Sequence, residues 1–281
     1  MGVPGSLEKS EADFGSTVHR LVKRVSGNST VEVYDDLADE VPVALEYNGI
    51  SHAVMLATPA ALEQFAIGFS LSEGIVGALG DIFEVEVEQG GAGITVHLRI
   101  EGAAFMKLKE RRRNLTGRTG CGLCGTEDLG QVMRPLARLP ARALAASSVH
   151  RALAGLKQFQ PLSGLTGATH AAAWSDSTGN VIAAYEDVGR HNALDKLIGA
   201  LVRNDAGAED GFIVITSRCS FEMIAKAAVF GASTLVALSA PTSLAIERAQ
   251  ACGVTLIAIA RPDRAMSFAG PDSAAGGGLA A

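Results

Sequence analysis

Apolar and polar residues alternate strictly over residues 82–100, IFEVEVEQGGAGITVHLRI, on both sides of a glycine-rich turn. Strict alternation is typical of paired strands that bury one face and expose the other to solvent. The sequence therefore predicts a hairpin at these residues. Its inward face would carry Val85, Val87, Ile94, Val96, Leu98 and Ile100.

A second strand pair and a helix are predicted before this hairpin. Asn48-Gly49 lies between two apolar runs, and both residue types accept the positive φ angles of a tight hairpin turn. Residues 58–74, TPAALEQFAIGFSLSEG, follow as a helix, with Thr58 as its N-cap and Pro59 in its first turn. Two hairpins combined with a single helix indicate an α+β domain.

The pattern changes in the second part of the chain. A helical stretch is predicted over about 126–158, and two strands follow around the turn at 177–180. After them, continuous apolar runs such as FIVI and LIAIA alternate with helices. Continuous apolar strands between helices are typical of parallel strands covered on both faces, which is an α/β arrangement.

These patterns divide the chain into five segments. They are a flexible polar N-terminus at 1–28, an α+β domain at 29–115, a mobile glycine-rich loop at 116–130, an α/β domain at 131–268 and a disordered Gly/Ala-rich tail at 269–281.

Composition excludes several classes of protein. The 281 residues carry a formal net charge of −6, which argues against non-specific binding of nucleic acid. We find no apolar run long enough to span a bilayer and no signal-peptide core near the N-terminus. Four cysteines are too few for a disulfide scaffold. We therefore expect a cytoplasmic protein with reduced thiols and no membrane partner.

Polar clusters follow four consecutive strands of the predicted α/β domain. Carboxyl ends of parallel strands meet at one edge of a sheet, so these clusters should share one rim. Ser220 and Thr242 are candidate helix caps, and we expect His191 and His170 to be hydrogen-bonded structural groups. Helix caps do not require arginine, however, and several arginines on one rim would suit a phosphate-bearing ligand. The four are Arg190, Arg218, Arg261 and Arg264.

The segment TGCGLCG places Cys121 and Cys124 among glycines, after a basic helix. A zinc site would need two further ligands, and no second C-x-x-C is present. A thioredoxin-like dithiol would open a helix after a strand, which this loop does not. A sulfur carrier needs a swinging cysteine that is partly thiolate, and the arginines at 111–113 and 118 would lower its pKa. We favour a persulfide carrier.

The motifs TGCGLCG, EDVGRHNALDK, SRCSFEMIAKA and SAPTSLA, in this order, resemble the formate dehydrogenase accessory sulfurtransferase family, FdhD. The resemblance covers about residues 30–268. It implies a three-layer α/β domain similar to cytidine deaminase, with a smaller N-terminal α+β domain. It also implies that Cys121 carries the persulfide and that Cys124 is its companion.

The resemblance further implies a function and its partners. The family takes sulfur from a cysteine desulfurase and delivers it to the molybdenum cofactor, bis-molybdopterin guanine dinucleotide, for the formate dehydrogenase apoenzyme. A homodimer is implied, and no permanently bound metal. In this sequence the segment that would bind the cofactor is Ile259, Ala260, Arg261, Pro262, Asp263 and Arg264.

Two other classes of function remain open. One is a chaperone that binds the molybdenum cofactor without transferring sulfur, for which the cysteines would be dispensable. The other is a deaminase-like hydrolase, which needs a His/Cys-x-Glu and a Pro-Cys-x-x-Cys arrangement around zinc. TGCGLCG has no preceding proline, and His170-Ala171-Ala172 has no glutamate, so we do not favour the hydrolase.

Overall fold

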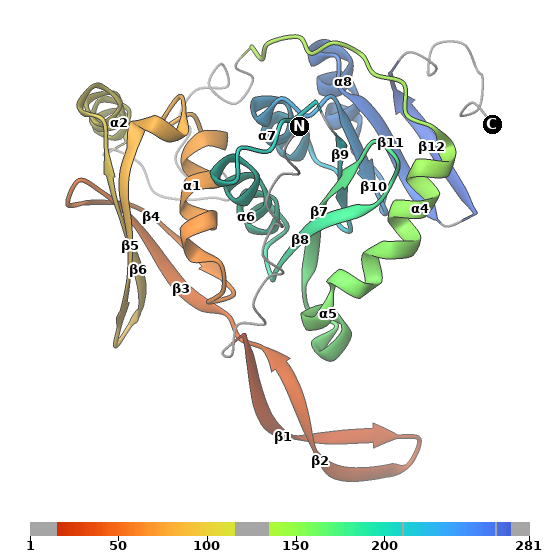
Figure 1. Cartoon of the computed structure of the whole chain (residues 1–281). Coiled ribbons are helices and arrows are strands. Elements are labelled where there is room, and N and C mark those ends of the chain that lie inside the picture. The colour runs from red at the N-terminus through yellow and green to blue at the C-terminus, as the bar shows by residue number, and fades with distance from the viewer. Residues whose placement is uncertain (1–15, 116–134, 210, 262, 271–281) are drawn as a thin grey trace.

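A computed structural model describes residues 16–115, 135–209, 211–261 and 263–270. Within these residues the strands form a two-stranded, a four-stranded and a six-stranded sheet. Helices α1 and α6 lie between the two larger sheets (Figure 1). No helix of the described part is long and apolar enough to cross a membrane.

The four-stranded sheet has the order β4-β3-β6-β5. Its strands are β3 (Val41–Tyr47), β4 (Ile50–Ala57), β5 (Ile82–Gly90) and β6 (Gly93–Ile100), with the short 3₁₀ helix η1 (Leu79–Asp81) before β5. The Asn48-Gly49 turn has φ angles of 47° and 80°, which confirms the predicted hairpin. One face of the sheet packs against α1 (Leu62–Ser72) and α2 (Gly102–Leu115).

The alternating pattern of residues 82–100 predicted this sheet well. Every second residue of β6 is buried from Ile94 to Ile100, as expected. The prediction is wrong for Val87, whose side chain is 41 % exposed. Val87 lies on β5, the edge strand of the sheet, where less of the chain covers it.

Thr58 does not cap the helix that follows it. Helix α1 begins at Leu62, and its N-cap residue is Ala61, with a φ of 52° and no side-chain capping bond. The Thr58 hydroxyl instead donates to the Asp187 carboxylate at 3.0 Å. A capping hydroxyl would accept an N–H of the first helical turn, but the Thr58 hydroxyl oxygen accepts from Lys196 Nζ at 2.7 Å, so the predicted cap is wrong.

The six-stranded sheet has the order β12-β11-β10-β9-β7-β8. Its strands are β7 (His170–Asp176), β8 (Val181–Asp187), β9 (Gly211–Ile215), β10 (Thr234–Ala237), β11 (Thr255–Arg261) and β12 (Arg264–Ala269). Strands β9, β10 and β11 are parallel, as predicted. Strands β7 and β12 are antiparallel to their neighbours, because the turns beside them are too short for a crossover.

Helices cover both faces of this sheet, which confirms the α/β class and the three layers. One face packs against α6 (Arg190–Arg203), α7 (Phe221–Phe230) and α8 (Ser243–Cys252). The other face packs against α4 (Ala146–Leu156). The 3₁₀ helix η2 (Lys157–Phe159) and helix α5 (Pro161–Thr166) continue from α4. The likeness to cytidine deaminase stays a prediction.

Of the long helix predicted over 126–158, the last part is confirmed, and residues 126–134 lie outside the described residues. Residues 135–145 are not helical, and α4 begins at Ala146. Pro135 and Pro140 lie in this stretch, and proline disrupts a helix interior by removing an N–H donor. The extended segment is tied to the body at Leu139, whose N–H donates to the Cys252 carbonyl.

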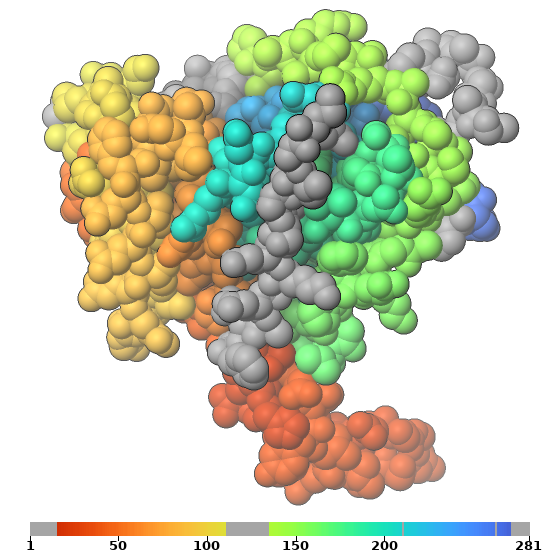
Figure 2. Space-filling view, viewed as in Figure 1, coloured from red at the N-terminus to blue at the C-terminus, as the bar shows by residue number. Residues whose placement is uncertain are grey.

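The N-terminal part contains a ribbon whose first strand the sequence analysis missed. Strand β1 (Thr17–Ser26) pairs with β2 (Ser29–Ala38) over ten residues each, so the predicted flexible segment 1–28 is wrong for residues 17–26. The ribbon projects away from the two larger sheets (Figures 1 and 2). Of the predicted tail 269–281, Ala269 belongs to β12 and 271–281 lie outside the described residues.

The two predicted domains meet through a close contact between α1 and α6. A side chain at Gly68 would overlap the Asp195 carbonyl oxygen, and one at Gly199 would overlap the Gln64 carbonyl oxygen. Two glycines therefore let the helix backbones approach each other more closely than side chains would permit.

We expect Gly199→Ala to lower the free energy of unfolding by about 2 kcal/mol, because α1 and α6 must separate to admit the methyl group. Urea unfolding of the full chain measures this. Gly155→Ala in α4 is the matched control, since its nearest neighbour is 3.7 Å away, and it should raise stability by about 0.5–1 kcal/mol. Equal effects of the two substitutions would contradict the close contact.

Candidate functional site

Six chain segments converge at one edge of the six-stranded sheet. Strand β7 is antiparallel to both β8 and β9, so β8 runs in the same direction as β9, β10 and β11. The carboxyl ends of these four strands therefore share one edge, as predicted. The same edge receives the starts of β7, at His170, and of β12, at Arg264. We call this edge the rim.

The β8 end of the rim holds a cluster of charged groups. His191 Nε2 lies 2.9 Å from Glu222 Oε2, and both side chains are about one-third exposed. The hydrogen bond from His191 lowers the pKa of Glu222. Burial, and next the positive charge of Arg190, lower the pKa of His170. His191 is thus hydrogen-bonded as predicted, and His170 is half-buried and favours the neutral form.

Two polar atoms in this cluster are buried with neither a hydrogen-bond partner nor an ion-pair partner among the described residues. They are Ser220 Oγ and Arg190 Nε. Ser220 lies at the N-cap of α7 but its side chain makes no capping bond, so the predicted cap is wrong. Thr242 does cap α8, because its hydroxyl accepts from the Ala245 N–H at 3.2 Å. The unpaired atoms beside the α7 N-terminus would suit an oxyanion.

The β11 end of the rim carries the segment predicted to bind the cofactor. Arg261 and Arg264 are exposed, and neither forms an ion pair with the described residues. Arg261 Nη1 donates to the carbonyls of Leu238 and Ala260, which directs the guanidinium toward the strand ends. Asp263 is exposed beside them. Pro262 lies outside the described residues.

Ala260 and Ile259 are the remaining two residues of that segment, and they differ from the arginines in burial and in backbone conformation. The Ala260 side chain is buried at 1 % exposure, so only its backbone is open to a ligand. Ile259 has a φ of 51°, which a β-branched residue adopts only at a cost. Here the β11–β12 pairing shifts register, and the Ile259 N–H donates to the Ser239 carbonyl at 3.2 Å. The strained residue thus joins the loop after β10 to the loop after β11.

The arginines of the rim do not form one cluster. Four strand-to-strand steps separate the ends of β8 and β11, which at about 4.8 Å per step is roughly 19 Å. Arg190 therefore lies far from Arg261 and Arg264, and exposed Arg218 follows β9 between them. One phosphate would contact only one end of the rim, whereas an elongated anionic ligand would contact both.

The two described cysteines are buried. Cys219 is fully buried at the end of β9, and burial raises the pKa of its thiol to about 12. Burial also raises the pKa of Cys252, which fills apolar space at the end of α8. Thiolates react and thiols do not, so neither is suited to sulfur chemistry. Cys121 and Cys124 lie outside the described residues.

Much of the motif EDVGRHNALDK is interior and not part of a ligand site. Lys196 Nζ and Asp187 Oδ2 are 2.6 Å apart, and both side chains are fully buried. The Thr58 N–H and hydroxyl both donate to Asp187, and Lys196 donates to the Thr58 hydroxyl at 2.7 Å. This cluster joins the first part of the chain to the second. The sequence analysis did not predict the contacts among Lys196, Asp187 and Thr58.

A second buried ion pair links α7 to α6 and to the end of α1. Lys226 of α7 donates to both oxygens of Asp195 at 3.0 Å and to Glu73 at 2.7 Å. Ser72 donates to Asp195 at 2.7 Å. Burial opposes the charge on Lys226, but Asp195 and Glu73 outweigh it and raise the pKa of the lysine. Lys226 therefore stays protonated inside the protein.

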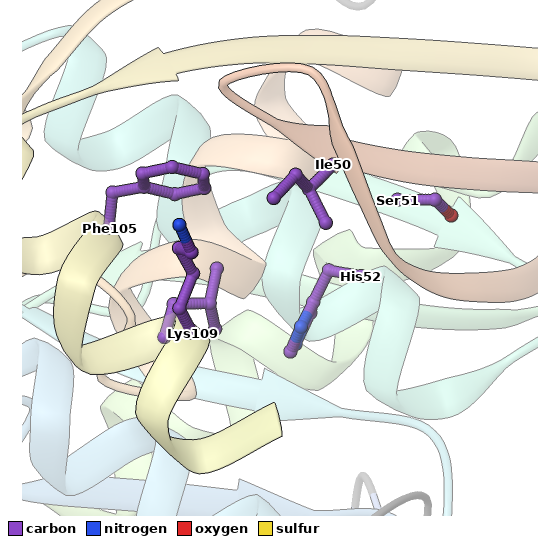
Figure 3. A pocket seen from close by; sticks show the side chains of 6 residues that line it. Ile50, Ser51, His52, Phe105 and Lys109 are labelled. Carbon is purple, nitrogen blue, oxygen red and sulfur yellow. The ribbon is translucent and has the colours of Figure 1, made fainter. Parts of the chain in front are cut away.

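A small pocket lies apart from the rim, between β4 and α2. Figure 3 shows Phe105 and Lys109 of α2 facing Ile50 and His52 of β4. The Lys109 ammonium lies 5.5 Å from the centre of the Phe105 ring. The surface that lines the pocket is apolar, although Ser51, His52 and Lys109 border it. Among the residues that the structure describes, no group of three or more His, Cys, Asp or Glu is arranged to hold a metal ion.

The fold and the rim define an α/β protein with an arginine-bearing sheet edge and two buried thiols of raised pKa. Residues 38–275 match the model of the FdhD/NarQ family, and the chain belongs to that family. The match leaves out nearly all of the β1–β2 ribbon. The family predicted from the sequence motifs is thereby confirmed.

Individual relatives agree with this assignment. The chain is 52% identical over 242 residues to the sulfur carrier protein FdhD of Cupriavidus necator, covering 84% of this chain and 83% of the relative. It is 48% identical over 268 residues to the sulfur carrier protein FdhD of Bordetella bronchiseptica, covering 94% and 97%. A putative formate dehydrogenase accessory protein from Desulfotalea psychrophila has a similar crystal structure, with a TM-score of 0.75, 22% identity and 92% and 98% coverage. That likeness supports the fold.

The strain at Ile259 can be measured by comparing two substitutions. We expect Ile259→Gly to be more stable than Ile259→Ala by about 1 kcal/mol, because alanine at positive φ is strained and glycine is not. Met266→Ala and Met266→Gly on exposed β12 are the control pair, and there alanine should be the more stable. Urea unfolding of the four variants decides. The same order at both positions would argue against strain at residue 259.

The buried pair of Lys226 and Asp195 should be costly to break from one side. We expect Lys226→Met to lower the free energy of unfolding by about 3–5 kcal/mol, since Asp195 would be left buried without its cation. The double variant Lys226→Met with Asp195→Leu should recover part of that loss. A loss below about 1 kcal/mol in the single variant, measured by chemical denaturation, would show that the lysine is not needed to compensate the carboxylate.

Proposed function

We propose that this protein is a sulfurtransferase that carries sulfur as a persulfide on Cys121, from a cysteine desulfurase to the molybdenum cofactor. The sulfurated cofactor, bis-molybdopterin guanine dinucleotide, would serve the formate dehydrogenase apoenzyme in the cytoplasm. Membership of the FdhD/NarQ family and relatives named sulfur carrier protein support the sulfur-carrying part of this proposal.

The burial of Cys219 and Cys252 is the observation that carries the proposal. A sulfur acceptor must be accessible and partly thiolate, and these two thiols are neither. Of the four cysteines of the chain, Cys121 and Cys124 are left for the reaction. The glycines at 120, 122 and 125 favour movement of the segment, and Arg118 favours the thiolate.

Loading is a thiolate–persulfide exchange. The Cys121 thiolate attacks the outer sulfur of the desulfurase persulfide. The S–S bond of the donor breaks, and the donor cysteine leaves as a thiolate with the electron pair. Cys121 then carries S–SH, and no oxidant or reductant is consumed in this step.

Release uses the second thiol of the pair. The Cys124 thiolate attacks the inner sulfur, on Cys121, and the outer sulfur leaves as hydrosulfide with the electron pair of the broken S–S bond. The metal of the bound cofactor would accept this sulfur as a sulfido ligand, and the proton of the hydrosulfide would pass to solvent. A Cys121–Cys124 disulfide remains, and a thiol reductant returns it to the dithiol.

The rim is the candidate binding edge for the cofactor, which is here the substrate that receives sulfur. Its phosphates are anionic, and the rim offers exposed Arg261 and Arg264 at one end and unpaired Arg190 Nε and Ser220 Oγ at the other. The roughly 19 Å between the two ends suits an elongated dinucleotide better than a mononucleotide. Ile259, Ala260, Pro262 and Asp263 would contribute mainly shape and backbone contacts.

Intact-protein mass spectrometry tests the carrier function. We expect wild-type protein incubated with a cysteine desulfurase and L-cysteine to gain the mass of one sulfur atom, which a reductant removes. Cys121→Ala should abolish the gain because the acceptor thiolate is missing. Cys219→Ala is the matched control and should load like wild type, since that thiol is buried.

The Cys124→Ala variant separates loading from release. It should accept sulfur but retain it when cofactor is added, because the attacking thiol is absent. No sulfur gain in wild type, under conditions that load another acceptor, would refute the carrier function. Retained cofactor binding would then favour the chaperone that binds cofactor without sulfur transfer.

A further inference from the structure

The described part of the chain leaves one face of the four-stranded sheet open. Helix α1 packs against the other face (Figure 1), where alternate residues of each strand are buried. The residues between them point away from α1, because side chains alternate across a strand. We call the surface that they form the open sheet face. It runs from Leu56 on the edge strand β4 to Glu88 on the edge strand β5.

The β4 side of the open sheet face is apolar. Leu56 lies opposite Pro42 on β3, and Val54 lies opposite Ala44, so the four side chains form one patch. The exposed fractions are 56% for Leu56 and 61% for Val54. Contiguous apolar side chains on a protein surface are typical of a site that contacts another molecule.

The β5 side of the open sheet face is acidic. Glu84, Glu86 and Glu88 alternate along β5 and share this face. The Arg99 Nε atom donates to Glu84 at 3.0 Å, and His97 Nε2 lies 3.0 Å from Glu88. Glu86 forms no ion pair with the residues that the structure describes. Part of the negative charge is therefore not compensated within the chain.

The central cation of the face is already shared by two carboxylates. His97 on β6 lies between Glu88 on β5 and Glu46 on β3, and its Nδ1 is 3.0 Å from Glu46 Oε1. The hydrogen bonds to Glu88 and Glu46 raise the pKa of His97, which favours the protonated ring. Even with His97 protonated, the glutamates of the face outnumber its cations. The face thus combines an apolar patch with an excess of negative charge.

We propose that the open sheet face binds a cationic amphipathic helix of a partner protein. The helix lies along the strands, with its apolar side on Leu56 and Val54 and its lysines or arginines directed toward the β5 glutamates. An eight-residue strand such as β6 is about 26 Å long, and a helix of about 18 residues has a similar length. The bound helix covers this face of the sheet as α1 covers the other.

The charge and the position of the apolar patch select this occupant. Nucleic acid, an anionic membrane surface or a second copy of the open sheet face would each bring negative charge against the glutamates. A partner strand paired to the edge of β4 would leave Val54 and Leu56 exposed, because these side chains point out of the face and not along the edge. The proposal does not depend on the sulfur-transfer function.

A synthetic helical peptide is the probe for the first test. A labelled peptide of about 18 residues is built from Leu, Ala and Lys, with Leu along one side and Lys on both flanks. Fluorescence anisotropy should show saturable binding to the full chain, and circular dichroism should show that the peptide gains helix when it binds. A scrambled peptide of the same composition has no apolar side and should bind about tenfold more weakly.

Two substitutions of apolar residues separate the apolar patch from general charge attraction. We expect Leu56→Asp to weaken peptide binding about tenfold, because it places a carboxylate under the apolar side of the helix. Val31→Asp is the matched control, since Val31 is 53% exposed on the β1–β2 ribbon and this variant adds the same charge. It should bind the peptide like wild type. If net charge alone attracted the peptide, the two variants would bind it alike.

Two substitutions of glutamate test the acidic side in the same way. Glu86→Lys should weaken peptide binding about tenfold, because it places a cation opposite the lysines of the helix. Glu32→Lys on the exposed ribbon makes the same change in net charge away from the open sheet face and should have little effect. Unchanged thermal unfolding shows that each variant is folded.

Any of four outcomes would overturn the proposal. Wild type that does not bind the amphipathic peptide at millimolar concentration would exclude the helix site. Equal binding by Leu56→Asp and Val31→Asp would show that the apolar patch is not used. Equal losses for Glu86→Lys and Glu32→Lys would reduce the interaction to net charge. Binding without a gain of helix in the peptide would contradict a helical occupant.

Discussion

The ammonium of Lys196 and the carboxylate of Asp187 lie 2.6 Å apart in a part of the protein that water does not reach. Such a pair is tolerated only when each charge keeps its partner, and removing either would leave an uncompensated ion. Thr58, from the first part of the chain, bonds to both groups. Separating the first part of the chain from the second would remove the hydrogen bonds between Thr58 and this buried ion pair. The two parts therefore behave as one unit.

The same carboxylate also shapes the functional edge of the larger sheet. Asp187 ends β8, and its second oxygen accepts from the Gly189 N–H at 2.8 Å and from Asn192 at 3.0 Å. These bonds hold the turn from which α6 begins. Arg190 and His191 occupy the first positions of that helix. Their placement on the rim thus depends on a fully buried charge.

Local patterns predicted the parts of this fold that are determined locally. The Asn48-Gly49 turn, the buried face of β6 and the parallel strands β9–β11 follow from residues close together in the sequence. The partners of buried charges do not: Thr58 and Asp187 are 129 residues apart, and Lys226 and Ser72 are 154 apart. Strand β1 escaped prediction because it mixes apolar and charged residues on both faces. Of the candidate site, the arginines and the rim were predicted, but the distance between its two ends depends on strand order.

The contact between α1 and α6 has a consequence for the newly made chain. Helix α1 buries residues on every side, including Leu62, Phe65 and Ile67, because it lies between a sheet and another helix. About 130 residues separate it from α6, and at 5–20 residues per second the ribosome needs on the order of ten seconds to supply them. During that interval one apolar side of α1 has no native surface to cover it. The nascent chain is then a natural client for chaperones that hold apolar segments.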